Sequence, residues 1–290
     1  MTDLLSLSPL NGHAVGIILK EVVRRAILAI RNERQVFEVT AKEGYSGGMT
    51  DVCTSADQKA QAVYLRSLRE CFPDFGIVAE EDGFAVQPKN GCTSFFTVDP
   101  LDGTRAFVRR QSHGVGTMIA LVNSGEVVSA YIGDINTHEI YGFRPGSTHV
   151  HRITEFETGE VLGHESRPLA EHYVLLRDPE RIYSPASQAL IGRFRAYEIE
   201  GGSIGIWLAR LWKREVGAAL LPPSIETPWD SAPVVGISRA LGYVFLKPAD
   251  GGSGWTRFDP VISDKMARRD HDMLVIHRDD EAGLAKLLTG

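Results

Sequence analysis

Two aspartates, Asp99 and Asp102, stand close together at the end of the apolar run of residues 95–98. If that run is a strand, both carboxylates lie at one exposed corner where the strand ends. Magnesium prefers oxygen ligands and usually keeps some of its water, so such a corner can hold the ion. The carbonyl of Leu101, between the two aspartates, offers a further oxygen ligand. This short segment therefore predicts a site for a hard cation.

Gly103 and Thr104 follow the aspartates directly and suit a phosphate group. Glycine lets an anion approach the backbone closely, and residues 105–107 could begin a helix whose N-terminal amides favour negative charge. A metal ion and a phosphate can thus share one corner. The alternative is an ordinary turn after a strand, which a lone Asp-Gly pair would favour. The six specified positions in succession, residues 99–104, favour the functional interpretation.

Two further acidic residues stand upstream in suitable contexts. Glu80 ends a second β-like run, residues 75–79. Asp57 falls in the first turn of a helix predicted over residues 54–71. Carboxylates at strand ends and helix starts are available to a cleft. Taken singly, each of these acids also fits a solvated side chain or a capping residue.

Four segments, in this order and at similar separations, resemble the signature segments of the inositol monophosphatase family. The first surrounds Asp57 in residues 53–59, and the second is Ala79-Glu80-Glu81. The third is residues 99–104, and the fourth is Trp229-Asp230-Ser231-Ala232-Pro233. The third and fourth segments are specific, whereas the first two are individually weak. The resemblance covers residues from about 54 to 246 and implies the family's α+β or α/β layered sandwich, in which layers of helices and sheets alternate.

The resemblance also implies which residues bind metal and which do the chemistry. The implied ligands of two or three Mg²⁺ ions are Glu80, Asp99, the Leu101 carbonyl, Asp102 and Asp230, with Asp57 near the third ion. Catalytic roles are implied for Asp57, Glu80 and Thr104, and among these Thr104 and Asp57 orient the attacking water. The amides of Gly103 and Thr104 are implied to hold the phosphate.

Gly202 and Ser203 match the position where the family has a Gly-Ser or Gly-Thr pair in contact with substrate. The alternative is a glycine pair that merely ends a strand.

The residues before Asp230 depart from the inositol-type pattern. Those enzymes have an acidic residue seven positions upstream, where this chain has Pro223. Glu226 could substitute for it, although it also fits an exposed loop carboxylate.

These features predict Mg²⁺-dependent hydrolysis of a small phosphate monoester by metal-activated water. Uncatalysed hydrolysis of such esters is among the slowest of reactions, requiring up to ~10²¹-fold acceleration. Two metal ions about 3.5–4 Å apart can lower the pKa of the attacking water and neutralise the leaving alkoxide. The resemblance further implies inhibition by lithium.

Several alternatives stay open. Residues 102–107 resemble the histidinol-phosphate phosphatase branch as much as the inositol branch. A 3′,5′-bisphosphate nucleotide or a sugar bisphosphate could equally be the substrate. The chain could also be a catalytically silent relative that binds a phosphorylated ligand. The intact carboxylate set argues against silence, because clustered acids without cations repel one another.

Two pairs of residues near these motifs have less specific patterns. Arg109 and Arg110 could add positive potential near the phosphate, or could belong to a solvated face. His149 and His151 are spaced like metal ligands on one strand face, but no third ligand accompanies them. The histidines are therefore assigned no role.

The elements that must position these residues fall into two halves. Residues 1–145 predict an α+β half with most of the metal ligands, and residues 146–290 predict an α/β half with Asp230 and the substrate-contacting segment. The first half is expected to contain helices over residues 15–30 and 54–71, a flexible loop over 43–48 and an antiparallel meander over 116–122, 127–132 and 139–143. The second half is expected to alternate strands over 173–176, 218–221 and 243–246 with helices over 187–194, 203–213 and 232–241.

The composition argues against several classes of protein. The net charge of -6 gives no basic footprint for nucleic acid, and no run approaches the roughly 20 apolar residues of a membrane helix. Three cysteines without CxxC spacing argue against a disulfide framework or a zinc cluster and fit a reducing cytoplasm. Residues 1–10 lack the pattern of a secretory signal. We therefore expect a cytoplasmic protein that acts on a small phosphorylated metabolite, and the resemblance implies a homodimer.

Overall fold

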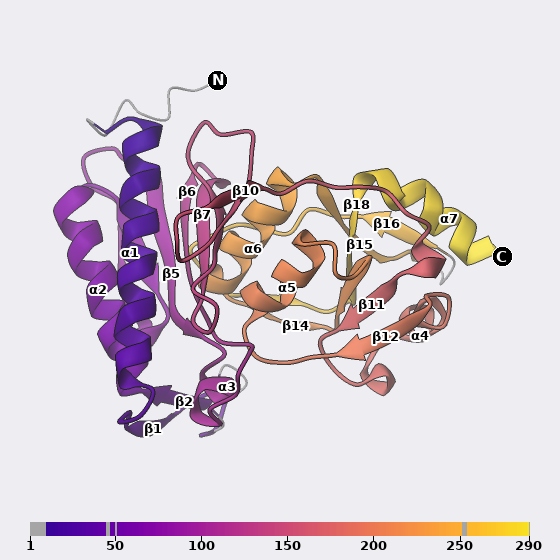
Figure 1. Ribbon diagram of the computed structural model, residues 1–290, viewed down its shortest axis with the longest axis horizontal. Coiled ribbons are helices and arrows are strands. Elements are labelled where there is room, and N and C mark those ends of the chain that lie inside the picture. The colour runs from indigo at the N-terminus through magenta and orange to yellow at the C-terminus, as the bar shows by residue number, and fades with distance from the viewer. Residues whose placement is uncertain (1–9, 45–46, 50, 251–253, 290) are drawn as a thin grey trace.

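Helices and sheets alternate in layers in the computed structural model, which describes residues 10–44, 47–49, 51–250 and 254–289 (Figure 1). The first layer consists of α1 (Gly12–Glu33) and α2 (Ser55–Cys71), which cover one face of an eight-stranded sheet. Helices α5 (Ile204–Trp212) and α6 (Pro228–Ala240) lie between the other face of this sheet and a six-stranded sheet. Helices α4 (Pro185–Ile191) and α7 (Glu281–Thr289) pack on the outer face of the second sheet. The predicted layered sandwich is thus confirmed.

The eight-stranded sheet contains the predicted meander and extends beyond it. Its strands, in spatial order, are β10 (Gly159–Val161), β9 (His151–Ile153), β8 (Ile140–Phe143), β7 (Glu126–Asp134), β6 (Gly116–Asn123), β5 (Ser94–Asp102), β3 (Gly76–Ala79) and β4 (Ala85–Val86). The eight-stranded sheet continues past the predicted boundary between residues 145 and 146, because β9 pairs with β8 and β10 pairs with β9. A turn at Pro145 and Gly146 lies between β8 and β9.

The centre of this sheet is buried on both faces. In β6, Ile119 and Leu121 pack toward α1 and α2, whereas Met118 and Ala120 pack toward α5 and α6. Neighbouring side chains of a strand point to opposite faces, so a strand between two helix layers is apolar at every position. This explains why β5 and β6 are mostly apolar, with only a few buried hydroxyl side chains such as Thr97 and Thr117 before their polar ends.

The six-stranded sheet is mixed. Its strands, in spatial order, are β12 (Ala196–Ile199), β11 (Tyr173–Leu176), β13 (Ala218–Leu221), β18 (Met273–His277), β15 (Tyr243–Pro248) and β16 (Trp255–Arg257). Two antiparallel two-stranded sheets are also present: β1 (Val39–Lys42) with β2 (Asp51–Thr54), and β14 (Ser224–Glu226) with β17 (Ala267–Arg269). A short helix, α3 (Thr104–Val108), follows β5 directly.

One predicted helix differs from the observed element in a way that matters for the site. The helix expected over residues 232–241 begins at Pro228, so Asp230 lies in its first turn. Proline is favoured at the first helical position because its missing amide hydrogen would have no helical partner there. In the sequence, this proline suggests a turn instead.

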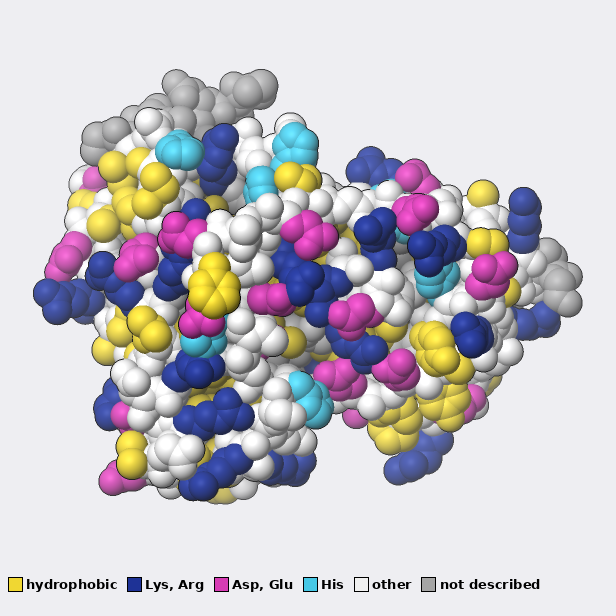
Figure 2. Space-filling view, in the orientation of Figure 1, with side chains coloured by type: hydrophobic (Ala, Val, Ile, Leu, Met, Phe, Trp, Pro, Cys, Tyr) yellow, Lys and Arg dark blue, Asp and Glu magenta, His cyan; other side chains and the backbone are white. Residues whose placement is uncertain are grey.

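Some sequence-based expectations fall partly on segments beyond the structural description. The flexible loop expected over residues 43–48 includes Tyr45 and Ser46, which lie outside the described residues. Of the N-terminal residues 1–10, which lack the pattern of a secretory signal, only Leu10 is described. None of the helices in the described ranges is long and apolar enough to cross a membrane. Figure 2 shows Lys and Arg interspersed with Asp and Glu over the face in view.

Candidate active site

A β-bulge at the end of β5 aims Asp99 and Asp102 into one cleft. Asp99 pairs opposite Met118 and Asp102 opposite Gly116, so β5 contains one residue more than β6 over this interval. In a regular strand, residues three apart face opposite sides. The extra residue of a bulge restores a common direction and leaves a backbone position unpaired, which Pro100 can occupy.

Glu80 lies beside Asp99 because of the pairing between β3 and β5. These strands are parallel, and the amide of Glu80 donates to the carbonyl of Val98 at 3.2 Å. The carboxyl ends of parallel strands meet at the same edge of a sheet, so residues that directly follow the two strands become neighbours. The prediction that acids after these two strands face one cleft is therefore consistent with the observed topology.

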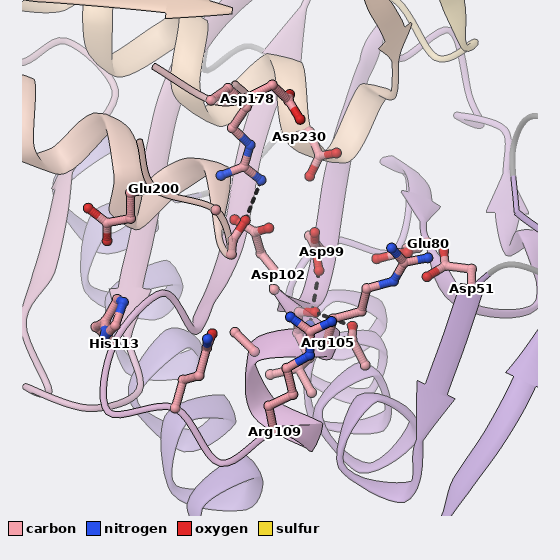
Figure 3. Close-up of a pocket in the computed structure, with 18 of the residues that line it drawn as sticks. Asp51, Glu80, Asp99, Asp102, Arg105, Arg109, His113, Asp178, Glu200 and Asp230 are labelled. Carbon is pink, nitrogen blue, oxygen red and sulfur yellow. Dashed lines mark hydrogen bonds between the residues drawn. The ribbon is translucent and has the colours of Figure 1, made fainter. Parts of the chain in front are cut away.

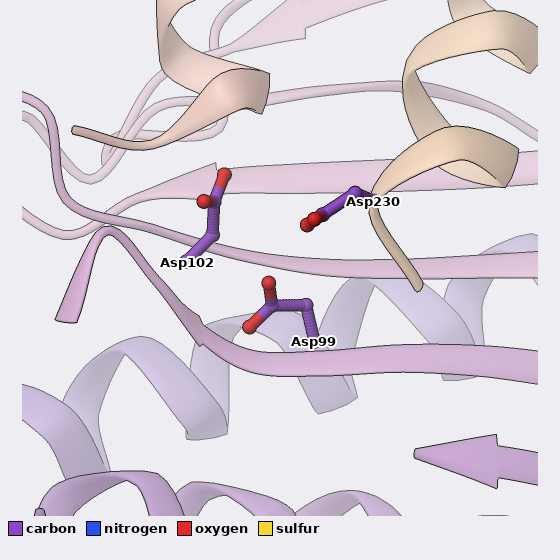
Figure 4. A group of neighbouring side chains, drawn as sticks. All are labelled: Asp99, Asp102 and Asp230. Carbon is purple, nitrogen blue, oxygen red and sulfur yellow. The ribbon is translucent and has the colours of Figure 1, made fainter. Parts of the chain in front are cut away.

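Asp230 reaches the same corner from the other half of the chain. It lies in the first turn of α6, where the Thr227 hydroxyl donates to its Oδ2 at 2.7 Å. One carboxylate oxygen from each of Asp99, Asp102 and Asp230 lies within 4.8 Å of the others (Figure 4). Two elements far apart in the sequence, β5 and α6, thus bring three carboxylates into a small volume.

The electrostatics of this cluster favour a bound cation. Asp99 and Asp102 are buried. Burial is the largest cause of a raised pKa at Asp99, and the charges of Glu80, Asp102 and Asp230 raise this pKa further. Burial likewise raises the pKa of Asp102 and Asp230. A bound cation would favour the ionised form of these carboxylates, and their converging oxygens are the ligands that Mg²⁺ prefers.

Within the described part of the chain, this is the only such convergence of three or more acidic, histidine or cysteine side chains. His149 and His151 do not belong to it.

Thr104 and Asp57 form a linked pair behind the cluster. The Thr104 hydroxyl lies 3.0 Å from the Leu101 carbonyl oxygen and 3.2 Å from Asp57 Oδ1. Asp57 is fully buried and also accepts hydrogen bonds from the amide and hydroxyl of Thr54, which caps α2. Burial raises the pKa of Asp57 to about 7. A carboxylate with this pKa, joined to a hydroxyl at the cleft, can hold or take up a proton near neutral pH.

Gly103 lies where the two halves of the chain cross closely. Its φ is +86°, and an added Cβ would lie 2.3 Å from the Gly114 carbonyl oxygen. Gly202 has φ +87° and approaches the same oxygen. The amide of Ser203 donates to this oxygen at 2.8 Å. Both glycines are therefore required by the backbone crossing, whatever they contribute to substrate.

Ser203 is fully buried and contacts a predicted metal ligand. Its hydroxyl donates to Asp102 Oδ2 and accepts from the amide of Ile206. The same side chain therefore both caps α5 and orients Asp102. The amide of Gly205 also donates to Asp102 Oδ2, at 3.1 Å. In this arrangement Ser203 supports Asp102 from behind, while Gly202 lines the cleft. Substrate contact by Gly202 and Ser203 stays a prediction.

Sequence reasoning missed a lysine at the edge of the site. Lys42, at the end of β1, places Nζ 2.8 Å from one oxygen of Glu80 and 2.8 Å from one oxygen of Glu81. Burial alone would lower the pKa of Lys42, but the two carboxylates together outweigh it, so the pKa is raised and the lysine stays cationic. Lys42 therefore supplies positive charge at the Glu80 side of the acidic cluster. No spacing signal in the sequence connects it to these acids.

A second missed residue, Arg177, directly follows strand β11 and lines the cleft. Its Nη2 donates to the Gly202 carbonyl, and its guanidinium lies 5.9 Å from the ring centroid of Trp207. Its Nη1 is buried without a hydrogen-bond partner. The Arg-Asp pair after an apolar strand is a sequence signal that could have indicated this residue.

The cleft that contains these residues has a volume of about 740 Å³ (Figure 3). Arg105 and Arg109 of the α3 region and His113 also line it, and in Figure 3 the Arg105 side chain extends toward Glu80 and Asp51, away from His113. Arg110, in contrast, lies over the ring of Phe37 at 6.0 Å from the centroid. Of the two arginines noted in the sequence, Arg109 thus faces the cleft.

The acidic cluster leads to a prediction about stability. Replacing Asp230 with asparagine is expected to stabilise the Mg²⁺-free protein by about 1 kcal/mol, the equivalent of one pKa unit, because it removes a like charge. The same change should abolish stabilisation by Mg²⁺, which would otherwise reach about 2.7 kcal/mol at a hundredfold excess over Kd. Melting temperatures with EDTA and with MgCl₂ provide the measurement.

The pH dependence follows from the direction of the pKa shifts. The native pKa values are raised, so the metal-free fold is stabilised by protonation and loses this stability as the pH rises from about 4, the ordinary aspartate value, through the native values. The gain from Asp230→Asn should therefore be larger at pH 8 than at pH 5. Asp178→Asn, in the same cleft but outside the cluster, should keep the Mg²⁺ response. A retained Mg²⁺ shift in Asp230→Asn would contradict the metal assignment.

Comparison with known proteins gives matches of three kinds. Nus factor SuhB from Haemophilus influenzae is 32% identical over 113 residues, which are 36% of this chain and 42% of the relative. The 3′(2′),5′-bisphosphate nucleotidase CysQ from Salmonella typhimurium is 40% identical over 76 residues, 26% of this chain and 30% of the relative. The matched part of the chain thus spans less than half the length of these curated relatives.

The fold and the family follow from two broader matches. An IMPase/NADP phosphatase solved with Mg²⁺ and phosphate is 17% identical, with a TM-score of 0.68 over 96% of both chains, and therefore shares the fold. A model of the inositol monophosphatase family matches residues 13–281, nearly the whole chain. The protein therefore belongs to the inositol monophosphatase family, as the four sequence segments predict.

Proposed function

We propose that this protein hydrolyses small phosphate monoesters in a Mg²⁺-dependent reaction. The observation that carries the proposal is the convergence of Asp99, Asp102 and Asp230 within 4.8 Å, in the same cleft as Thr104. Membership of the inositol monophosphatase family supports it. Two or three Mg²⁺ ions would be held by these aspartates, Glu80 and the Leu101 carbonyl, with Asp57 near the third.

Bound Mg²⁺ would lower the pKa of the attacking water and neutralise charge on the leaving oxygen. The residues of the chain would then orient the reactants. The Thr104 hydroxyl, 3.2 Å from Asp57 Oδ1, is suited to position the water, and Asp57 to accept its proton. The backbone at Gly103 and Thr104 would bind the phosphate. Arg105 and Arg109 add positive charge along the same cleft.

The choice among substrates is supported by the surroundings of Glu226. Its carboxylate accepts hydrogen bonds from Arg269, Ser224 and Ser231, at 2.7, 2.9 and 2.9 Å. An acid with three internal donors is poorly available to a ligand hydroxyl. Because Pro223 stands at the position of the usual acidic residue, inositol phosphate is disfavoured as a substrate.

Histidinol phosphate, a 3′,5′-bisphosphate nucleotide and a sugar bisphosphate remain candidate substrates. A catalytically silent relative that binds a phosphorylated ligand also remains a candidate. A homodimer and a cytoplasmic location also stay predictions.

The test is phosphate release by the purified protein from inositol 1-phosphate, histidinol phosphate, adenosine 3′,5′-bisphosphate and fructose 1,6-bisphosphate. We expect turnover with MgCl₂, loss of turnover with EDTA, recovery when Mg²⁺ is returned, and inhibition by LiCl. The kcat/KM values rank the substrates. Substantial turnover without metal would contradict the Mg²⁺-dependent mechanism. Binding of these esters without any turnover would indicate a catalytically silent protein that binds a phosphorylated ligand.

A further inference from the structure

A second cavity, of about 200 Å³, adjoins the catalytic cleft and shares Asp230 with it. It lies between the first turns of α5 and α6, over the end of β13 and the start of β18. Its walls are largely apolar, formed by Ile204, Leu208, Leu221, Val234, Phe245 and Phe258. A mostly apolar cavity beside converging polar groups is the usual form of a small-molecule site.

The polar groups of this cavity are poorly suited to a polyol. Glu226 and Arg269 both line it, but they pair with each other at 2.7 Å. Arg269 also donates to the carbonyl of His271 and to the hydroxyl of Ser224. Asp259, Arg268 and Asp270 also belong to the lining, but they are exposed to solvent. The hydroxyls of an inositol ring in the apolar part of the cavity would therefore lose water without gaining equivalent partners, which is unfavourable.

Aromatic side chains form part of the wall instead. Phe245 is buried, and Phe258 is partly buried against the same core. The rings of Phe258 and His271 meet edge to face, with centroids 4.6 Å apart and planes at 84°. The Nδ1 of His271 lies 2.9 Å from the carbonyl oxygen of Asp272, which fixes the ring. Aromatic rings favour such edge-to-face and offset contacts with one another.

We infer that this cavity holds the organic half of the phosphate ester and that this half carries an aromatic ring. The inference rests on the proposed phosphatase function, because it assigns the alcohol part of the same substrate. An engineered apolar cavity of about 150 Å³ binds benzene, so about 200 Å³ has room for one ring and a short linker. The shared Asp230 puts the ring next to the phosphate-bearing end.

Two esters with alkyl leaving groups test the inference: 2-phenylethyl phosphate and propyl phosphate. Their alcohols have similar acidity, so a difference in kcat/KM reports binding of the ring rather than leaving-group chemistry. Burying the ring should raise kcat/KM roughly 10- to 100-fold. Equal values for the two esters, both hydrolysed with Mg²⁺, would overturn the aromatic subsite and leave the proposed function standing. If neither ester nor the earlier panel is hydrolysed, the proposed function fails.

Binding of the product alcohol gives a readout that does not depend on turnover. We expect 2-phenylethanol to bind the Mg²⁺-free protein in ligand-detected NMR, and propanol to bind at least tenfold more weakly. Val234→Phe fills the cavity, and Phe258→Ala removes one wall; each should weaken 2-phenylethanol binding at least tenfold. Phe156→Ala, at a side chain that is 86% exposed, is the matched control and should leave binding unchanged. Unchanged binding in both cavity variants would overturn the inference.

Discussion

Replacing Asp99 with asparagine is expected to reduce Mg²⁺-dependent phosphate release at least ~10³-fold, because a metal ligand contributes several kcal/mol of charge stabilisation and each 1.36 kcal/mol corresponds to tenfold in rate. Asp99 is the member of the cluster whose pKa is raised by all three neighbouring acids, so it lies at the electrostatic centre. Its Oδ1 accepts from the Leu101 amide at 3.0 Å. The asparagine oxygen can keep this bond, so the turn should be retained.

The fold of the variant should therefore stay intact while turnover is lost. The measurements are kcat/KM with saturating MgCl₂ and the melting temperature with EDTA, which should not fall. Asp134→Asn is a matched control: Asp134 is also buried at a strand end, but it accepts from the amides of Asn136 and Thr137 away from the cleft. An Asp99→Asn protein with a tenth or more of the original activity would contradict the proposed mechanism.

The sequence predicts those parts of the site that depend on single elements. Glu80 and Asp99 each follow an apolar run, and parallel pairing of the two runs is enough to bring them together. Asp57 occupies the first turn of α2, as helix-capping patterns predict. Such features are local, so residue type and spacing are sufficient to find them. The four ordered segments then predict the family, which the match over residues 13–281 confirms.

The remaining features depend on contacts between distant parts of the chain. Lys42 reaches Glu80 and Glu81 from a separate hairpin, and nothing in its neighbourhood marks this role. The hydroxyl of Ser203 contacts Asp102 across 101 residues of sequence. A Gly-Ser pair at a helix start fits both a substrate contact and a cap, and only the three-dimensional arrangement reveals its hydrogen bond to Asp102.

The crossing at Gly103 leads to the largest expected effect on stability. Gly103 and Gly125 have nearly the same positive φ, +86° and +83°. Nothing lies within 4 Å of a Cβ added at Gly125, whereas one added at Gly103 would lie 2.3 Å from the Gly114 carbonyl oxygen and 2.7 Å from the Ser203 amide nitrogen. Alanine at Gly125 therefore measures the cost of the left-handed backbone alone, about 1–2 kcal/mol.

Alanine at Gly103 adds a clash between two backbone segments, which cannot move aside as a flexible side chain could. Overpacking of this kind costs a further ~1–3 kcal/mol or more, so we expect Gly103→Ala to lose about 4 kcal/mol in total. For a protein of this size that corresponds to a fall in melting temperature of roughly 8–16 °C. The clash also pushes on Ser203, whose hydroxyl donates to Asp102, so Mg²⁺ should stabilise the variant less than it stabilises Gly125→Ala. Equal losses of stability in the two variants, measured by thermal unfolding, would mean that the crossing is not closely packed and that Gly103 is required only for its backbone conformation.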